Sequence, residues 1–237
     1  MATKIKERAH VREPLNRERI LRSAVALADE GGVDSLSMRR IAQELGVVPM
    51  ALYKHVANKE ELLDGLVDAV IAEIDPPILG ADWKTTMRER ILSARRALLR
   101  HPWASQVIES RAEPTPMVIG YIDSMMGIFL SGGFSIDLMH HAIHVMGSRI
   151  LGFSQELFDD TASMPTDEAL AMWTQMAEAY PSIAKLVGAL SGGEIGHEEE
   201  SIVGGGCDDQ FEFEFALDLI LDGLERLRER ETAPARD

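Results

Sequence analysis

Apolar residues recur at every third or fourth position through most of this 237-residue chain. This spacing places them along one face of an α-helix, so it predicts helices. Strand-like alternation is limited to the run FEFEF (211–215), and the helical spacing resumes directly after it, which favours a helix there too. The pattern therefore predicts an all-α protein, with a small N-terminal three-helix head and a larger helical domain behind it.

Helix start and stop signals delimit the elements of the head. Asn16 and Asn58 are good N-cap residues for a first and a fourth helix. Asp75-Pro76-Pro77 ends the fourth helix, because proline has no amide hydrogen to donate. The predicted helices span residues 17–31, 37–45, about 49–56 and 59–74. The expected domains are a flexible basic arm at 1–16, a DNA-binding domain at 17–75 that joins the three-helix head to the connecting helix 59–74, and a second domain at 76–237.

Longer helices are predicted in the second domain. Asp82 can cap a helix to Arg100, and Pro114 and Pro116 can open another that ends at Gly132-Gly133. A short helix is expected to end at residue 110, one or two lie between 167 and 190, and the last spans about 209–230. The helix at 136–159 carries an apolar stripe with the spacing of a packing seam. Residues 191–208 are rich in Gly and acidic residues, and they are predicted to form a mobile loop.

The segment 36–66, LSMRRIAQELGVVPMALYKHVANKEELLDGL, carries the pattern of a helix-turn-helix. Ser37 can cap a helix, Gly46 suits a tight turn because glycine adopts positive φ at little cost, and Pro49 can begin the next helix. Leu52 and Val56 face the core, so the opposite side of this second helix is exposed. Two short helices with this arrangement are typical of a protein that inserts the second helix into the DNA major groove.

The chemistry of the exposed side chains suggests a role for each. Arg39 can contact a phosphate or a guanine edge, and Lys54 a base or a phosphate. Met50 and Ala51 offer only apolar contacts, for example to a thymine methyl group. The other side chains suit phosphate contacts or line the same surface. The predicted DNA-binding residues are Ser37, Arg39, Pro49, Met50, Ala51, Tyr53, Lys54, His55 and Lys59.

The net charge of −15 is unusual for a protein that binds DNA, but its distribution agrees with that function. Residues 1–60 hold 11 Lys and Arg against 8 Asp and Glu, a net charge of +3, and the remainder carries −18. Only the head therefore attracts phosphate, and the acidic remainder disfavours indiscriminate binding to DNA.

The motifs IAQELGV, LYKHV and NKEELLD resemble those of the TetR (tetracycline repressor) family of transcriptional regulators. WKTTMRERILSARRALLRH and GFSIDLMHHAIHVMGSRILGF resemble helices of that repressor's C-terminal domain. The resemblance implies a repressor that binds a palindromic double-stranded operator as a homodimer and is released by a small-molecule effector. It also implies a four-helix bundle at the dimer interface and an effector site beneath helix 59–74. The implied interface residues are Met146, Ile150, Phe153, Leu157, Phe213, Leu217, Ile220 and Leu224.

The resemblance also implies where an effector binds. The metal-ligand positions of the tetracycline repressor fall near Asp75 and Ile108, and Ile108 cannot ligate a metal, so magnesium-tetracycline is not the expected effector. His140 and His144 lie one helical turn apart, which is a metal-sharing spacing, but without an obvious third ligand they are expected to line a pocket or pack. No metal site and no cofactor are predicted. The expected effector contacts are Arg90, Ala94, Ile108, Ile122, Met125, His140, Ile143, His144, Met172 and Met176.

The sequence argues against several classes of protein. No apolar run reaches membrane-spanning length, the N-terminus lacks an export signal, and a single cysteine, Cys207, fits a reducing compartment, so a cytoplasmic protein is expected. No G-x-S-x-G elbow, phosphate-binding glycine loop or zinc-protease motif is present, so an enzyme is not expected. An activator, a regulator without a ligand, and a helical ligand-binding module or enzyme without DNA function remain as alternatives.

Overall fold

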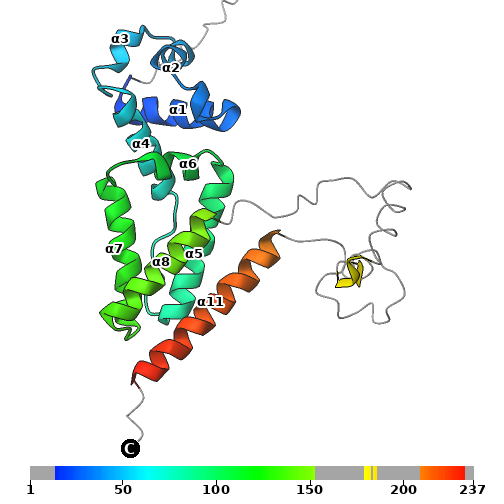
Figure 1. Cartoon of the computed structure of the whole chain (residues 1–237). Coiled ribbons are helices and arrows are strands. Elements are labelled where there is room, and N and C mark those ends of the chain that lie inside the picture. The colour runs from blue at the N-terminus through cyan, green and yellow to red at the C-terminus, as the bar shows by residue number, and fades with distance from the viewer. Residues whose placement is uncertain (1–13, 153–178, 183, 186–208, 233–237) are drawn as a thin grey trace, which may run out of the picture. The chain divides into compact units, whose positions relative to one another are not determined.

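The computed structural model describes residues 14–152, 179–182, 184–185 and 209–232 (Figure 1). Within these ranges the regular elements are helices and no strand is present, which confirms the predicted all-α class. The predicted contacts Phe153, Leu157, Met172 and Met176 lie outside the described residues, as do Cys207 and the whole of the predicted loop 191–208. The side chain of Ile150 lies outside them too.

The head contains four α-helices and a single 3-10 turn. These are α1 (Arg17–Gly31), η1 (Val33–Ser35), α2 (Met38–Leu45), α3 (Pro49–Leu52) and α4 (Lys59–Ala72). The caps form as predicted. The Asn16 and Asn58 side-chain oxygens accept hydrogen bonds from the backbone amides of Arg19 and Glu61, both with an N–O distance of 2.8 Å. The third helix was predicted to reach Val56 but ends at Leu52, whose carbonyl accepts the amides of both His55 and Val56 as the chain turns.

A hydrophobic core holds the head helices together. The side chains that are completely buried there come from all four α-helices and the turn after α3, and they include Ile20, Ile41, Leu52, Val56 and Leu66. Burying each of these side chains contributes roughly 1.5–3 kcal/mol. The same core continues into Ala97, Trp103, Ala104 and Val107, which belong to the second domain of the prediction. The head therefore shares apolar contacts with the helices that follow it.

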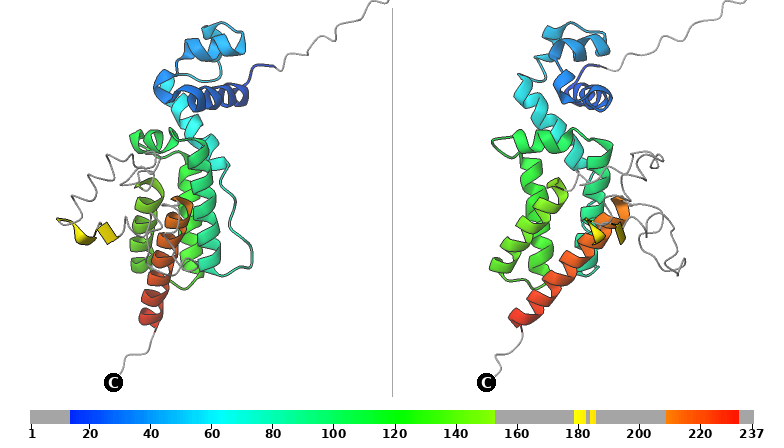
Figure 2. Two further views of the ribbon diagram at one scale, coloured as in Figure 1. Left: turned by 90° about the vertical axis from the view of Figure 1, so that its right-hand side faces the viewer. Right: turned by 45° about the vertical axis from the view of Figure 1, so that its right-hand side comes forward.

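The remaining described helices are longer. They are α5 (Trp83–Arg100), α6 (Ala104–Ser110), α7 (Pro116–Ser131), α8 (Ile136–Gly152) and α11 (Asp209–Thr232). Helix α7 begins at Pro116 and not at Pro114, because Thr115 is the N-cap and its hydroxyl accepts the Val118 amide at 3.2 Å. Helices α5 and α7 lie side by side (Figure 2). The run FEFEF is helical, as predicted.

The chain forms two compact units, one of residues 1–146 with 228–237 and one of residues 147–227. In the first unit, the end of α11 returns to the turn before α8, where Arg228 Nη1 donates to the Gly132 carbonyl at 2.7 Å. This division differs from the predicted domain boundary at residue 75, which stays a prediction. Among the described helices none combines the length and the apolar character needed to cross a bilayer.

Candidate nucleic-acid interface and effector site

A tight turn joins α2 to α3. Gly46 ends α2 with φ +66°, in the left-handed region that other residues rarely adopt, and the Val47 amide donates to the Ala42 carbonyl at 2.9 Å. Ala42 is buried and small, and α2 and α3 pack against each other around it. The predicted helix-turn-helix is therefore present in the head, and α3 occupies the position of the recognition helix.

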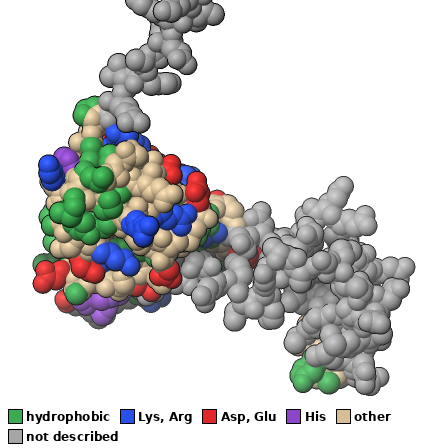
Figure 3. All heavy atoms as spheres, turned by 90° about the horizontal axis from the view of Figure 1, so that it is seen from above, with side chains coloured by type: hydrophobic (Ala, Val, Ile, Leu, Met, Phe, Trp, Pro, Cys, Tyr) green, Lys and Arg blue, Asp and Glu red, His purple; other side chains and the backbone are tan. Residues whose placement is uncertain are grey.

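The predicted DNA-binding residues lie mainly on the surface of this motif. Met50 is 72% exposed and Tyr53 45%, and Val48, which the sequence reasoning missed, is 68% exposed. Ala51 and His55 are half-buried, and the others are exposed: Ser37, Arg39, Pro49, Lys54 and Lys59. Seen from above, the head presents hydrophobic side chains next to Lys and Arg side chains (Figure 3). Such a mixture suits apolar contacts in a groove with phosphates on both sides.

Three cations of this surface are available to an external anion. Arg39, Lys54 and Lys59 form no ion pair with any residue in the described part of the chain. Ser37 has a structural role as well, since its hydroxyl accepts the Arg40 amide at 3.2 Å and caps α2. The local charge therefore agrees with phosphate binding, although whether these residues contact DNA stays a prediction.

Helix α4 is held at several points along its length. Arg111, just after α6, donates to Asp64 at 2.8 Å and pairs with Glu60, and the Thr115 hydroxyl donates to Asp68 at 2.6 Å. Near its middle, α4 crosses α1 closely, because a Cβ on Gly65 would lie only 2.5 Å from Leu21 Cδ2. These contacts couple the position of α4 to both α1 and the α6–α7 region.

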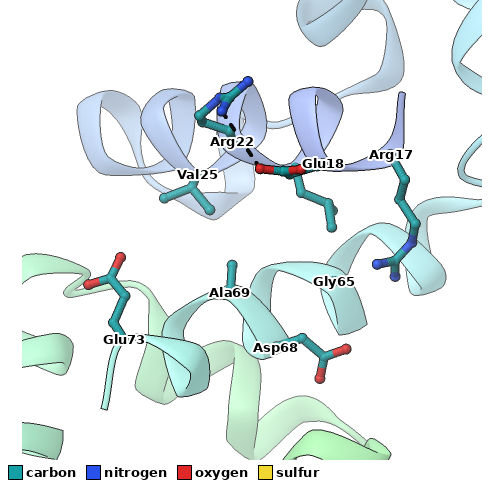
Figure 4. A pocket seen from close by; sticks show the side chains of 9 residues that line it. Arg17, Glu18, Arg22, Val25, Gly65, Asp68, Ala69 and Glu73 are labelled. Carbon is teal, nitrogen blue, oxygen red and sulfur yellow. Dashed lines mark ion pairs between the residues drawn. The ribbon is translucent and has the colours of Figure 1, made fainter. Parts of the chain in front are cut away.

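A groove of about 540 Å³ opens between α1 and α4 next to this crossing (Figure 4). Val25 and Ala69 face it from the two helices, and charged side chains, including Glu18 and Arg22, surround it. Helices α1 and α4 thus pack closely at Gly65 but are not packed tightly along the whole of their shared length.

A buried histidine joins the end of α1 to the helices that follow α4. His101 Nδ1 lies 2.8 Å from Asp29 Oδ1, and its Nε2 lies 3.1 Å from Glu73 Oε1. Trp103 Nε1 donates to the same Asp29 oxygen at 2.7 Å. A neutral imidazole has one N–H, so only the protonated ring donates to both carboxylates. Burial raises the pKa of Glu73, but hydrogen bonds from Arg100 and His101 outweigh it and hold that pKa below its ordinary value.

Replacing Asp29 with alanine is expected to lower the free energy of unfolding by about 2–4 kcal/mol, since two buried donors lose their acceptor. For a chain of this size the thermal midpoint should then fall by roughly 5–15 °C. Circular dichroism at 222 nm measures the change. The matched control is Asp34→Ala, an exposed carboxylate of the head. Identical melting of the two variants and the wild type would show that the junction contributes no stability.

The predicted effector contacts fall into three groups. Arg90, Ala94 and Met125 are buried, on α5 and α7. Ile108 is partly buried against the core shared with the head, and Ile143 is half-buried on α8. Ile122, His140 and His144 are exposed in the single chain. The first group is therefore buried on two helices that pack against each other, and the assignment of all of these residues to an effector stays a prediction.

The aligned metal positions do not fit a magnesium ion. Ile108 offers only carbon atoms, and the Asp75 carboxylate already accepts from Ser93 Oγ at 2.8 Å and from Arg96 Nη2 at 3.0 Å. These hydrogen bonds lower the pKa of Asp75. The rings of His140 and His144 lie 4.7 Å apart, but no group of three metal-ligating side chains occurs within the described ranges.

The predicted interface residues are distributed unexpectedly on α11. Phe213, Leu217 and Leu224 are buried in the single chain, as is Met146 on α8, and Ile220 is half-buried. The opposite face of α11 instead exposes Phe211, Phe215 and Leu219, of which the last two are 50% and 54% exposed. This second face was not predicted: every fourth residue from 211 to 219 is apolar, but the longer stripe through Phe213 and Leu217 conceals that spacing. The interface itself stays a prediction.

Comparison with known proteins gives two matching family models. The model described as "Bacterial regulatory proteins, tetR family" matches residues 20–66, and "Tetracyclin repressor-like, C-terminal domain" matches residues 76–228. The first covers the helix-turn-helix and the first half of α4, and the second runs from just after α4 into the last turns of α11.

Individual relatives agree with these matches. The tetracycline repressor protein class D of Escherichia coli is 32% identical over 160 residues, which are 66% of this chain and 72% of that repressor. The HTH-type transcriptional repressor DrrR1 of Streptomyces coeruleorubidus is 30% identical over 227 residues, 93% of this chain and 82% of that repressor. A solved structure, the TetR family protein ActR of Streptomyces coelicolor in complex with (S)-DNPA, is 27% identical with a TM-score of 0.64, covering 90% of this chain and 98% of ActR.

Proposed function

Because the chain belongs to the TetR family of bacterial regulatory proteins, we propose that it represses transcription as a homodimer on a palindromic operator and dissociates when a small molecule binds it. Family membership makes the chain a ligand-responsive, DNA-binding transcriptional regulator and not an enzyme. The single observation that carries the proposal is the exposed α2–α3 surface, with its tight turn at Gly46 and its available cations.

The exposed apolar face of α11 supports the dimer. Phe211 and Phe215 stack with ring centroids 6.2 Å apart, and Leu219 continues the same face one turn later. Contiguous exposed apolar side chains of this kind usually mark an interaction surface, and the commonest occupant is a second copy related by a two-fold axis. We therefore assign this face, in addition to the predicted residues, to the interface between two copies.

Helix α4 supplies the connection between the ligand and the operator. It begins shortly after the recognition helix, and its other end lies close to Asp75. The Asp75 carboxylate accepts a hydrogen bond from Ser93 of α5. A ligand that favours another position of α4 would change the separation of the two recognition helices in the dimer. The operator must then bind the other state better, since linkage is reciprocal, and a coupling of about 1–3 kcal/mol changes affinity roughly 5–150-fold.

Selection of binding sites from random DNA duplexes tests the proposal. The full-length protein is expected to enrich an inverted repeat whose half-site centres lie about 10–10.5 base pairs apart, or a multiple of that spacing. Such spacing places two major grooves on one side of the duplex. Enrichment of no sequence, or of a single unrepeated site, by protein that is folded would contradict the proposal.

A further inference from the structure

Arg90 is a buried cation, and no carboxylate within the described ranges pairs with it. The residue is 8% exposed, and its guanidinium donates to two neutral oxygens, the Asp75 carbonyl and the Ser124 hydroxyl. The nearby Asp75 carboxylate is held by Ser93 and Arg96 instead. Buried charges in proteins are normally paired, because removing a charge from water costs several kcal/mol. Arg90 therefore departs from this rule within the described part of the chain.

Two polar atoms of this region, one of them on Arg90 itself, have no partner among the described residues. Arg90 Nε and the Tyr121 hydroxyl are both buried and form no hydrogen bond within the described part of the chain. The guanidinium carbon lies 4.7 Å from the centre of the Tyr121 ring, so the two groups belong to one site between α5 and α7. Burial raises the pKa of Tyr121 to about 12, so its hydroxyl keeps a proton to donate. Burial also lowers the pKa of Arg90, but an arginine side chain stays protonated in proteins. The site thus offers positive charge and two unused donors.

We propose that this site binds the acidic group of the effector, and that the effector is a small organic acid with an apolar body. A carboxylate or a similarly acidic oxygen group accepts from Arg90 Nε and from the Tyr121 hydroxyl and supplies the missing negative charge. The inference rests on the proposed function, since it names the chemical class of ligand for that regulator.

Buried apolar side chains next to Arg90 and Tyr121 are the reason for proposing an apolar body on the ligand. Met87 and Ala94 lie one helical turn before and after Arg90 on α5, and Met125 lies one turn after Tyr121 on α7; all three are buried. Thioether side chains adapt to ligands of irregular shape. A hydrophobic ring system attached to the acidic group would contact these side chains.

The same arginine connects the ligand to α4. Arg90 Nη1 donates to the carbonyl of Asp75, shortly after the end of α4, and Nη2 donates to Ser124 on α7. The two unused donors are inaccessible to solvent, so an acid reaches them only when side chains of α5 and α7 move. Binding of the acid therefore changes the groups that hold the end of α4.

Matched pairs of acids and amides test the proposal. The full-length protein is titrated with 2-naphthoate and anthracene-9-carboxylate, and with the corresponding neutral amides, which have the same ring systems. Tryptophan fluorescence measures binding, and the anisotropy of a labelled operator duplex, obtained by the selection above, measures release. At least one acid is expected to bind ten or more times as tightly as its amide and to release the operator.

Amino-acid substitutions test whether the preference for the acid over its amide depends on Arg90 and Tyr121. Arg90→Met should abolish the preference for the acid, whereas Arg96→Met, an exposed arginine of the same helix, should retain it. Tyr121→Phe should weaken binding of the acid several-fold without lowering the thermal midpoint, because the hydroxyl it removes has no partner. Arg90→Lys keeps the charge, so it provides a folded comparison if Arg90→Met is unstable, and it should bind the acid more weakly than the wild type.

Equal affinity for acid and amide, failure of both acids to bind, or an acid preference that survives Arg90→Met would overturn the proposal. These outcomes differ from failure of the proposed function, which would appear as absence of a selected operator. A protein that binds its operator normally but shows no preference for acids would remain a regulator with a different class of ligand.

Discussion

Replacing Arg39 and Lys59 together with alanine is expected to weaken operator binding by roughly 10²–10³-fold near physiological salt. Both side chains are exposed and form no ion pair within the described residues. If each contacts one phosphate, a dimer loses four contacts. Each lost contact lowers the slope of log affinity against log salt by about 0.9, so the slope should become shallower by about 3.6.

The anisotropy of a labelled operator, titrated at several salt concentrations between about 50 and 200 mM, measures both quantities. Lys84→Ala with Arg88→Ala is the matched control, since it removes the same charge from α5, outside the head. This control should change affinity and slope little. A double variant of the head with wild-type affinity and salt slope would remove Arg39 and Lys59 from the interface.

Replacing Phe215 and Leu219 together with glutamate is expected to dissociate the dimer. Both side chains are about half exposed on the outer face of α11, and a two-fold interface would bury two copies of each. Burying four unpaired carboxylates costs several kcal/mol for each, more than a typical interface tolerates. The mass measured by light scattering should fall from about twice 26.2 kDa to 26.2 kDa.

Loss of the dimer should also weaken operator binding by more than about 10²-fold, because two linked heads bind two half-sites with a high effective concentration. Arg226→Glu makes an equal change in net charge on the same helix and should leave the mass unchanged. A Phe215 and Leu219 double variant that stays dimeric would exclude this face, and the interface would then have to form elsewhere.

The local signals in the head were predicted accurately from the sequence. The caps at Asn16, Ser37 and Asn58 and the positive φ at Gly46 are confirmed, because each depends on hydrogen bonds or backbone freedom within about four residues. The end of α3 was predicted four residues too late, since the apolar spacing to Val56 persists although the backbone has already turned. Apolar periodicity identifies a buried position but not the conformation that buries it.

The junction at His101 could not be predicted in this way. Asp29 and His101 lie 72 residues apart, and neither belongs to a motif, so no local pattern indicates that they meet. A partial signal is Pro102, which directly follows His101 and prevents a helix from continuing through it. It located the bend of the chain, but it did not indicate which side chains the bend brings together.

The helix-turn-helix is the part of the regulator that the sequence determined by itself, because caps, turns and one-faced helices follow from neighbouring residues. Only the tertiary structure decided which side of α11 stays exposed, and that Arg90 lies buried between α5 and α7 without a described carboxylate to pair with it. Burial and charge pairing depend on side chains that are distant in the chain. The family's way of reading DNA is thus evident in a short segment, whereas the chemistry of its ligand depends on how the longer helices pack.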